Sequence, residues 1–163
     1  GNNDLWIDRI EIIPLKKRKI SRLEYEAEEL LSLTGYQIDD AKAWNGKTRY
    51  AQSGRDKRGI MVYGPYESLP DGTYEVEFWL RCQPIQKDQP DKKVAAIEVT
   101  ANVGRKILAK KVLLSKDFLP GQDYQKYPLI FEVSDKTSDL EFRVHFLAQG
   151  DLWADRIILK PSP

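Results

Sequence analysis

The sequence predicts an all-β domain, a two-sheet antiparallel β-sandwich with jelly-roll topology. Apolar and polar residues alternate with a period of two in several segments from residue 72 onward, as half-buried strands require. Turn-rich pieces such as "LPDG" and "LPGQD" separate these segments. A helical period of useful length is suggested only by residues 25–35, "YEAEELLSLTG". Many short antiparallel strands without helices favour two packed sheets.

The first element, Leu23 to Glu28, is ambiguous from its residues alone. Its Ala, Glu and Leu content favours a helix. The chain around it consists of antiparallel strands, however, and an isolated helix fits that context poorly. We therefore expect a strand that leads into a short turn, and about nine strands in total from residue 22 on.

The later strands show their buried faces through alternation. In residues 72–82, "GTYEVEFWLRC", we expect an inward face of Tyr74, Val76, Phe78, Leu80 and Cys82. In "YPLIFEV" the expected inward residues are Tyr127, Leu129, Phe131 and Val133, and in "LEFRVHF" they are Leu140, Phe142, Val144 and Phe146. The segments "VAAIEVTA" and "KILAKKVLL" are predicted as two further strands.

One segment occurs twice. Residues 4–14, "DLWIDRIEIIP", nearly repeat residues 151–161, "DLWADRIILKP". Either the chain belongs to a tandem array, or one domain contains two equivalent strands. The separation of the copies is close to a typical domain size, so we favour the array. Residues 1–14 are then the last strand of a preceding copy, residues 15–21 a basic linker and residues 22–161 the β-sandwich, with neighbouring domains of the same polypeptide as partners.

Composition narrows the classes of partner. The chain has 163 residues, of which 41% are hydrophobic, enough for one domain with a modest core. With 26 Lys and Arg against 25 Asp and Glu, the net charge of +1 provides no broad field for nucleic acid or an anionic membrane. We therefore expect neutral partners and no nucleic acid. No apolar run approaches the roughly 20 residues of a membrane span, and the compartment stays open.

The sequence offers little catalytic chemistry, and we expect no enzyme. The single histidine, His145, lies on the outward side of its predicted strand. The single cysteine, Cys82, excludes an internal disulfide. No phosphate-binding glycine loop is present, and a pair of glycosidase carboxylates is defined by its separation across a cleft rather than by sequence.

Aromatic residues in turn-like segments are more informative. Trp44 lies in "AKAWNGKTRY", and Trp153 stands at the entry to the final strand. A sugar ring packs its C–H face on an aromatic plane, while its hydroxyls bond to polar groups such as Asn45, Arg49 and Asp151. These five residues are our candidate carbohydrate site. The alternative is that the rings cover an end of the core.

The order of these features resembles the galactose-binding-like jelly rolls, and among them the carbohydrate-binding modules of families 6 and 35. The resemblance spans most of residues 22–161 and rests on Glu26-Ala27-Glu28, "LPDGTYEVEFWL" and the closing "DLWADRIIL". The "GPY-x-x-LP-x-G-x-Y" stretch is also similar to modules appended to bacterial glycosyltransferases and methyltransferases. The sequence departs from the family in its last loop, where Gln149 and Asp151 stand in place of an obvious Asn.

The resemblance implies a non-catalytic carbohydrate-binding module of a larger, tandem-repeat protein of glycan metabolism, with a glycan as partner. The alternative function is a spacer or protein-interaction module without a sugar site. The two differ in whether Trp44 and Trp153 are exposed in a cleft or buried.

The resemblance also implies a structural calcium ion held by Glu26, Glu28 and Asp155. Alternation places Glu26 and Glu28 on one face, and it places Asp155 in register with Ile157 and Leu159, which point inward. An inward carboxylate needs a partner. Calcium is one such partner and a salt bridge to Arg156, Arg49 or another cation is the other, and both alternatives remain open.

Overall fold

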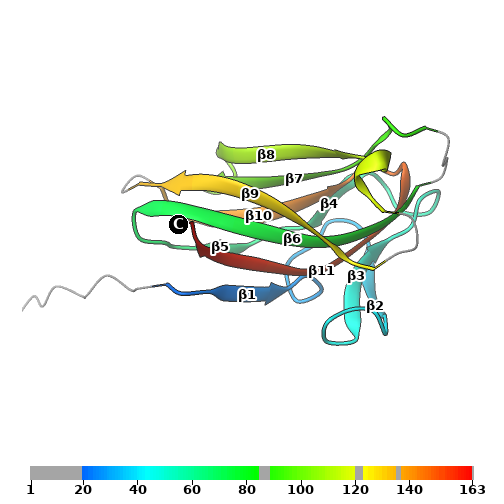
Figure 1. Cartoon of the computed structure of the whole chain (residues 1–163), viewed down its shortest axis with the longest axis horizontal. Helices are drawn as coiled ribbons and strands as arrows, with labels where there is room; N and C mark the ends of the chain where they lie inside the picture. The colour runs from blue at the N-terminus through cyan, green and yellow to red at the C-terminus, as the bar shows by residue number, and fades with distance from the viewer. Residues whose placement is uncertain (1–19, 85–88, 120–122, 135–136, 163) are drawn as a thin grey trace, which may run out of the picture.

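A computed structural model describes residues 20–84, 89–119, 123–134 and 137–162, which form two packed antiparallel β-sheets (Figure 1). The predicted strand at residues 1–14 and most of the predicted linker at 15–21 lie outside the described residues. The predicted all-β sandwich is confirmed. Within the described part of the chain, no helix is long and apolar enough to cross a membrane.

The larger sheet is built around its last strand. Its strands follow the order β2-β3-β11-β6-β9, and β1 also pairs with β11. The first half of β11 pairs with β3 at residues 152–154, and its second half pairs with β1 at residues 156–159. The bounds are β1 (Leu23–Glu26), β2 (Tyr36–Asp39), β3 (Lys47–Ala51), β6 (Gly72–Pro84), β9 (Gln125–Val133) and β11 (Gly150–Pro161).

The smaller sheet has the order β4-β10-β7-β8, and β5 pairs with β10 beyond the end of β4. A short 3-10 helix, η1 (Ser115–Asp117), follows β8. The chain passes repeatedly from one sheet to the other, as a jelly roll requires. The bounds are β4 (Gly59–Val62), β5 (Pro65–Glu67), β7 (Lys93–Ala101), β8 (Lys106–Leu114) and β10 (Leu140–Phe146).

The core lies between the sheets and consists of the residues that alternation assigned to it. Every predicted inward residue of β6, β9 and β10 is buried. Phe78 from the larger sheet and Phe142 and Phe146 from the smaller sheet are completely enclosed. The predicted strand-to-turn element is also confirmed, since β1 ends at Glu26 and a turn follows. Eleven strands form among the described residues, more than the nine predicted, because β2 to β5 are only three to five residues long.

One strand departs from simple alternation. The register between β11 and β6 shifts between Ala154 and Ile157, so both of these residues face the core and Asp155 and Arg156 form a β-bulge. The prediction that Asp155 keeps step with Ile157 and Leu159 is therefore wrong. Asp155 is nonetheless only 2% exposed, because the loop at residues 40–46 covers it and the Trp44 backbone N–H donates a hydrogen bond to its Oδ1 at 2.9 Å.

Candidate functional site

The outer face of the larger sheet carries a row of aromatic rings. Tyr36 on β2 lies opposite Tyr50 on β3, and Tyr50 lies opposite Trp153 on β11. Residues paired across neighbouring strands project from the same face. The Tyr50 and Trp153 rings therefore stack with centroids 4.7 Å apart, and the edge of Tyr36 meets Tyr50 at 5.6 Å. We call these three residues the aromatic strip.

Arginine side chains flank the aromatic strip at both ends. The Arg55 guanidinium lies 3.9 Å from the Tyr36 ring centroid, and that of Arg81 lies 4.2 Å from the centroid of Trp153. Asp40 accepts a hydrogen bond of 2.6 Å from Arg81 and one of 2.8 Å from the Tyr124 hydroxyl. The Trp153 ring is therefore covered by Tyr50 on one side and by Arg81 on the other.

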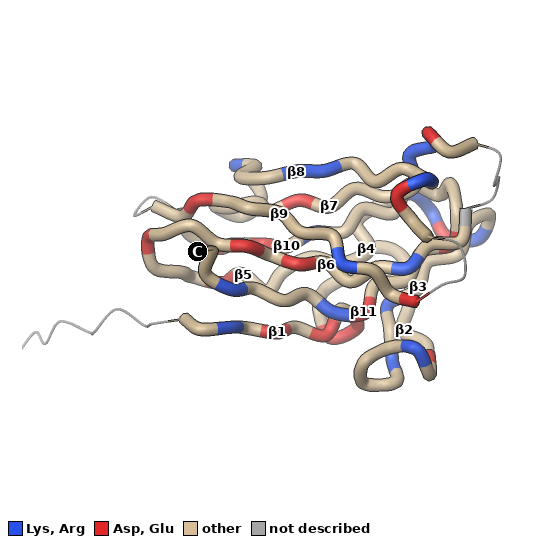
Figure 2. Tube along the Cα trace, viewed as in Figure 1, with Lys and Arg blue, Asp and Glu red and all other residues tan. Residues whose placement is uncertain are grey.

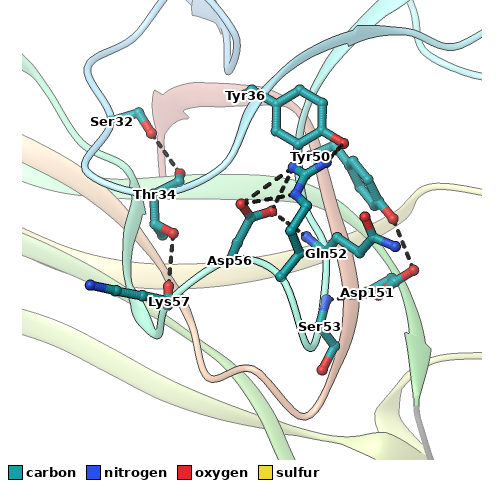
Figure 3. A network of polar contacts seen from close by, with 10 residues as sticks. Ser32, Thr34, Tyr36, Tyr50, Gln52, Ser53, Asp56, Lys57 and Asp151 are labelled. Carbon is teal, nitrogen blue, oxygen red and sulfur yellow. Dashed lines mark hydrogen bonds and ion pairs between the residues drawn. The ribbon is translucent and has the colours of Figure 1, made fainter.

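A polar network fixes the loop beside the strip (Figure 3). The Tyr50 hydroxyl donates to Oδ2 of Asp151 at 2.9 Å, and the Ser53 backbone N–H donates to its Oδ1 at 2.8 Å. Asp56 accepts from the Gln52 backbone N–H at 2.7 Å. Burial and the bond to Asp151 raise the pKa of Tyr50 above its usual value. Asp151 therefore already holds two internal donors.

Trp44 has a different environment. It lies in the loop between β2 and β3, and 69% of its surface is exposed. Its backbone is fixed by the bond to Asp155, and the Arg156 guanidinium lies 4.1 Å from its ring centroid. The same guanidinium is 4.9 Å from the ring of Trp79 on β6, and it donates to Glu24 at 2.8 Å. The indole is therefore held in place and yet remains largely in solvent.

Three carboxylates gather behind this loop. Oε1 of Glu28 accepts a hydrogen bond from the Asn45 side-chain amide at 2.7 Å. The second oxygen of Glu28 and one oxygen of Glu26 are buried without a hydrogen-bond donor among the described residues. Burial, with the negative charges of Glu28 and Asp155, raises the pKa of Glu26 to about 7. The nearby charge of Arg156 lowers the pKa of Glu26 but does not outweigh burial and the neighbouring carboxylates.

Asp155 has only a weak ion pair with the neighbouring arginine. Its Oδ2 lies 3.8 Å from Arg156 Nε, a long ion pair, and Arg156 is turned toward Glu24 instead. Among the described residues, no group of three or more His, Cys, Asp or Glu side chains is arranged to hold a metal ion. The two buried oxygens without donors fit the hard oxygen ligands that calcium prefers, whereas a convergent set of three does not form.

The five predicted sugar-site residues fall into three places. Trp44 and Asn45 lie together on the loop beside the carboxylates, whereas Trp153 belongs to the aromatic strip and Asp151 is bonded to Tyr50 of that strip. In the described part of the chain, Trp44 and Trp153 do not pack on each other. Arg49 points elsewhere, because its guanidinium donates to the backbone carbonyls of Glu28 and Leu30 at 2.6 and 3.1 Å and thereby fixes the turn after β1.

Several residues of this face escaped the sequence analysis. Tyr36, Tyr50 and Trp79 contribute rings, and Arg81 and Arg156 pack on rings. A signal was present for Trp79, because a tryptophan on the outward side of an alternating strand is exposed to solvent unless something covers it. The pairing of Arg156 with two tryptophans depends on the β11 bulge, for which the sequence carries no plain signal.

Comparison with known proteins shows the fold. No protein-family model and no curated protein sequence matches the chain. Among solved structures, the C-terminal family 6 carbohydrate-binding module of the laminarinase LamC from Zobellia galactanivorans matches with a TM-score of 0.56 at 13% identity, over 86% of this chain and 99% of that one. A family 6 module from Cellvibrio mixtus lichenase 5A, solved with cellotriose, matches with a TM-score of 0.56 at 12% identity, over 86% and 98%.

A match outside that family is also found. The K1 cleaved adhesin domain of Lys-gingipain from Porphyromonas gingivalis has a TM-score of 0.50 at 15% identity, over 88% of this chain and 99% of that one. At these identities the matches establish a common β-sandwich fold. Fold alone does not assign function, which has to be argued from the site.

Proposed function

We propose that this chain is a non-catalytic carbohydrate-binding module and that Trp44 is its principal sugar-stacking residue. The observation that supports this most directly is the 69% exposure of an indole whose backbone is fixed by Asp155 and whose ring is held by Arg156. An exposed large aromatic ring gains nothing from the core, while its fixed position lowers the entropy cost of binding a sugar ring.

The neighbouring rings suggest the path of a longer glycan. Arg156 contacts both Trp44 and Trp79, and Arg81, two residues further along β6, contacts Trp153. A polysaccharide that stacks on Trp44 meets Trp79 and the aromatic strip on the same outer face of the sheet. Asn45, next to Trp44 in the chain, and Asp151, bonded to Tyr50, are candidate polar contacts for the sugar, although each already holds internal hydrogen bonds.

The repeated segment supports a finer proposal about context. Residues 4–14 and 151–161 match at positions that include the tryptophan and the Asp-Arg-Ile that follows. We therefore place the module in a tandem-repeat polypeptide of glycan metabolism, next to domains of the same kind. Several weak sugar sites on one polypeptide raise the overall affinity for a polymer without any new contact.

The test of the sugar site is the Trp44→Ala variant, assayed on a broad panel of neutral glycans and by thermal melting. We expect a loss of affinity of about tenfold or more, equivalent to about 1.4 kcal/mol, with an unchanged melting temperature because the indole is exposed. Ile130→Ala is the matched control, since Ile130 is 61% exposed on β9 of the same sheet. Wild-type protein that binds nothing, or Trp44→Ala protein that binds normally, would contradict the proposal and favour a spacer.

Trp153→Ala should behave differently. Trp153 is half-buried and stacks on Tyr50, and such a pair contributes about 0.5–1.5 kcal/mol beyond its buried area. We therefore expect this variant to lower both the melting temperature and the affinity for long glycans. An unchanged melt would show that the aromatic strip does not stabilise the fold.

The proposal includes a structural calcium ion held by Glu26, Glu28 and Asp155, whose side chains would have to turn toward a common point to bind it, since they do not converge among the described residues. It is supported by the two buried oxygens without donors and by the raised pKa of Glu26, since a divalent cation relieves both. The unfolded chain does not assemble these ligands, so bound calcium stabilises the native state by mass action.

Thermal melts with excess calcium and with a chelator test this ion. We expect calcium to raise the melting temperature of the wild type and of Glu132→Gln, which alters an exposed carboxylate on β9, but not that of Glu28→Gln. Coincident wild-type curves would eliminate the ion and leave Arg156 and the Trp44 amide as the partners of the Asp155 carboxylate among the described residues.

A further inference from the structure

A pocket of about 250 Å³ lies on the outer face of the smaller sheet, on the opposite side of the sandwich from the aromatic strip. It owes its existence to a small residue in a central strand. Ala96 on β7 has His145 of β10 and Val112 of β8 as its cross-strand neighbours, and all three line the pocket. Because the alanine side chain is short, a hollow remains between its longer neighbours.

The titratable residues that line this pocket are all of the basic types: Arg58, Lys93, Lys110 and His145. In the described part of the chain, no Asp or Glu belongs to its lining. Figure 2 shows lysines along β8, the strand that forms one side of the pocket. This local excess of positive charge contrasts with the net charge of only +1 for the whole chain.

A buried carboxylate beneath the rim orients two of these groups. Glu98 on β7 is 3% exposed, and it lies 2.7 Å from Nε2 of His145 and 2.9 Å from Nζ of Lys110. Arg143 approaches the same carboxylate at 3.5 Å, although its main partner is Glu141. Burial raises the pKa of Glu98, but the hydrogen bonds from Lys110 and His145 outweigh burial and hold it below its usual value. The charge of Glu98 thus offsets that of Lys110, so the uncompensated positive charge at the pocket comes from Arg58 and Lys93.

The remaining two basic side chains of the pocket, Arg58 and Lys93, have no such internal contact among the described residues. Among the described residues, neither Arg58 nor Lys93 has an ion-pair partner, and both are exposed at the mouth of the hollow. A concave site that collects charges of one sign over an apolar floor concentrates the field on a counter-ion. Arginine binds a carboxylate or sulfate through two parallel hydrogen bonds, and lysine adds a point charge.

We propose that this pocket is a second binding site, which takes one ring-sized ligand bearing a single anionic group. Its volume lies just below the range of about 300–1,000 Å³ typical of drug-sized ligands, which suits a monosaccharide unit. Arg58 and Lys93 bind the anion, and the hollow over Ala96 accepts the ring. If the proposed function holds, the ligand is an acidic sugar of the same glycan. The anion site itself does not depend on Trp44.

The test is a titration followed by the backbone amide signals of Ala96, Lys110 and His145 in a two-dimensional NMR spectrum. The probes are glucuronate, glucose 6-sulfate, glucose and inorganic sulfate. We expect both anionic sugars to shift these signals, glucose to leave them unchanged, and the affinity to fall as salt increases. Whichever of glucuronate and glucose 6-sulfate binds with the higher affinity shows whether the pocket prefers a carboxylate or a sulfate group.

Three variants separate charge, shape and the other site. Arg58→Ala/Lys93→Ala should weaken glucuronate binding about tenfold or more. The matched control, Arg105→Ala/Lys106→Ala, removes the same charge from exposed positions at the β7–β8 turn and should bind normally. Ala96→Leu keeps every charge but fills the hollow, and should abolish sugar binding while it retains the fold. Trp44→Ala should bind glucuronate like the wild type.

The outcomes distinguish this inference from the proposed function. If Arg58→Ala/Lys93→Ala and its control lose the same affinity for glucuronate, the effect comes from the overall positive charge of the protein, and the proposed site is overturned. The absence of shifts with every anion, or a loss of binding in Trp44→Ala, would also overturn the site. Shifts with inorganic sulfate alone would overturn the assignment to a sugar. Neutral glycans that fail to bind while glucuronate still occupies the pocket would overturn the proposed function and uphold this inference.

Discussion

Among single residues, half-buried Glu26 and buried Glu98 show how neighbours decide the direction of a pKa shift. Both Glu26 and Glu98 lose solvent, which by itself raises the pKa of a carboxyl group. Glu98 faces Lys110 and His145, and its pKa is lowered. Glu26 faces further carboxylates, and its pKa is raised to about 7. The neighbouring groups therefore outweigh the effect of burial on the pKa of Glu98, whereas they add to it for Glu26.

The Glu98→Gln variant tests this account through its pH dependence. Because the pKa of Glu98 is lowered on folding from a usual value of 4.5, its contribution to stability is present above pH 4.5 and lost as pH falls through the folded-state pKa. We expect Glu98→Gln to reduce the unfolding free energy at pH 7 by about 1.5–3 kcal/mol, as for hydrogen bonds to charged groups. The difference from wild type should shrink toward pH 3.

Urea unfolding at both pH values measures the effect, with Glu132→Gln as the exposed control. A deficit of Glu98→Gln that is the same at pH 7 and pH 3 would show that the charge of Glu98 contributes nothing. The control variant should follow the wild type at both pH values.

Among the elements, β11 contributes most to the candidate site. It carries Trp153 on the aromatic strip, and its bulge turns Asp155 toward the Trp44 loop and Arg156 toward the two tryptophan rings. A regular strand would place successive side chains on opposite faces. The extra residue of the bulge therefore allows one strand to serve the aromatic strip, the carboxylate cluster and the exposed indole.

Strand β8 forms the edge of the smaller sheet in the strand order and is protected by charge. It carries Lys106, Lys110 and Lys111 beside exposed Ile107 and Val112. Lysines on an edge strand oppose pairing with a second molecule. We expect Lys106→Thr/Lys111→Val to cause concentration-dependent dimers in size-exclusion chromatography with light scattering. Lys57→Thr/Lys92→Thr changes charge outside the strands and should not, and identical elution of all three proteins would refute a protective role of these lysines.

The two outer faces of the molecule differ in chemistry. The larger sheet presents rings and paired arginines, and the smaller sheet presents the basic pocket. A net charge of +1 averages over both faces and led to the expectation of neutral partners. That expectation suits the face with Trp44, whereas the proposed pocket would bind an anion because its acidic neighbour is buried beneath it.

The prediction that residues 1–14 are the last strand of a preceding copy stays untested. The described core begins at Ile20 and draws on both sheets. If the segment belongs to a preceding copy, deletion of residues 1–15 should change the melting temperature by less than about 2 °C, the range of surface changes in a domain of this size. Calorimetry of the truncated and full chains measures it, and a large loss of stability would assign the segment to this fold.

Local patterns in the chain were sufficient for the fold class and for much of the core. Alternation identified the buried faces of β6, β9 and β10. Side chains two residues apart in a strand project from the same face, so the apolar face can be recognised from the local sequence. The exposure of Trp44 agrees with its place in a turn-like segment. The turn after β1 likewise followed from context rather than from propensity.

Register across strands was decided only in three dimensions. Tyr36 and Tyr50 meet Trp153, and Glu98 meets His145, because strands distant in sequence pair at one particular offset. Arg49 turns to the backbone of residues 28 and 30, and Asp155 leaves the expected alternation at a bulge. Each of these positions depends on how the two sheets bury their combined apolar surface. That free energy belongs to the packed sandwich, and no short segment of the chain contains it.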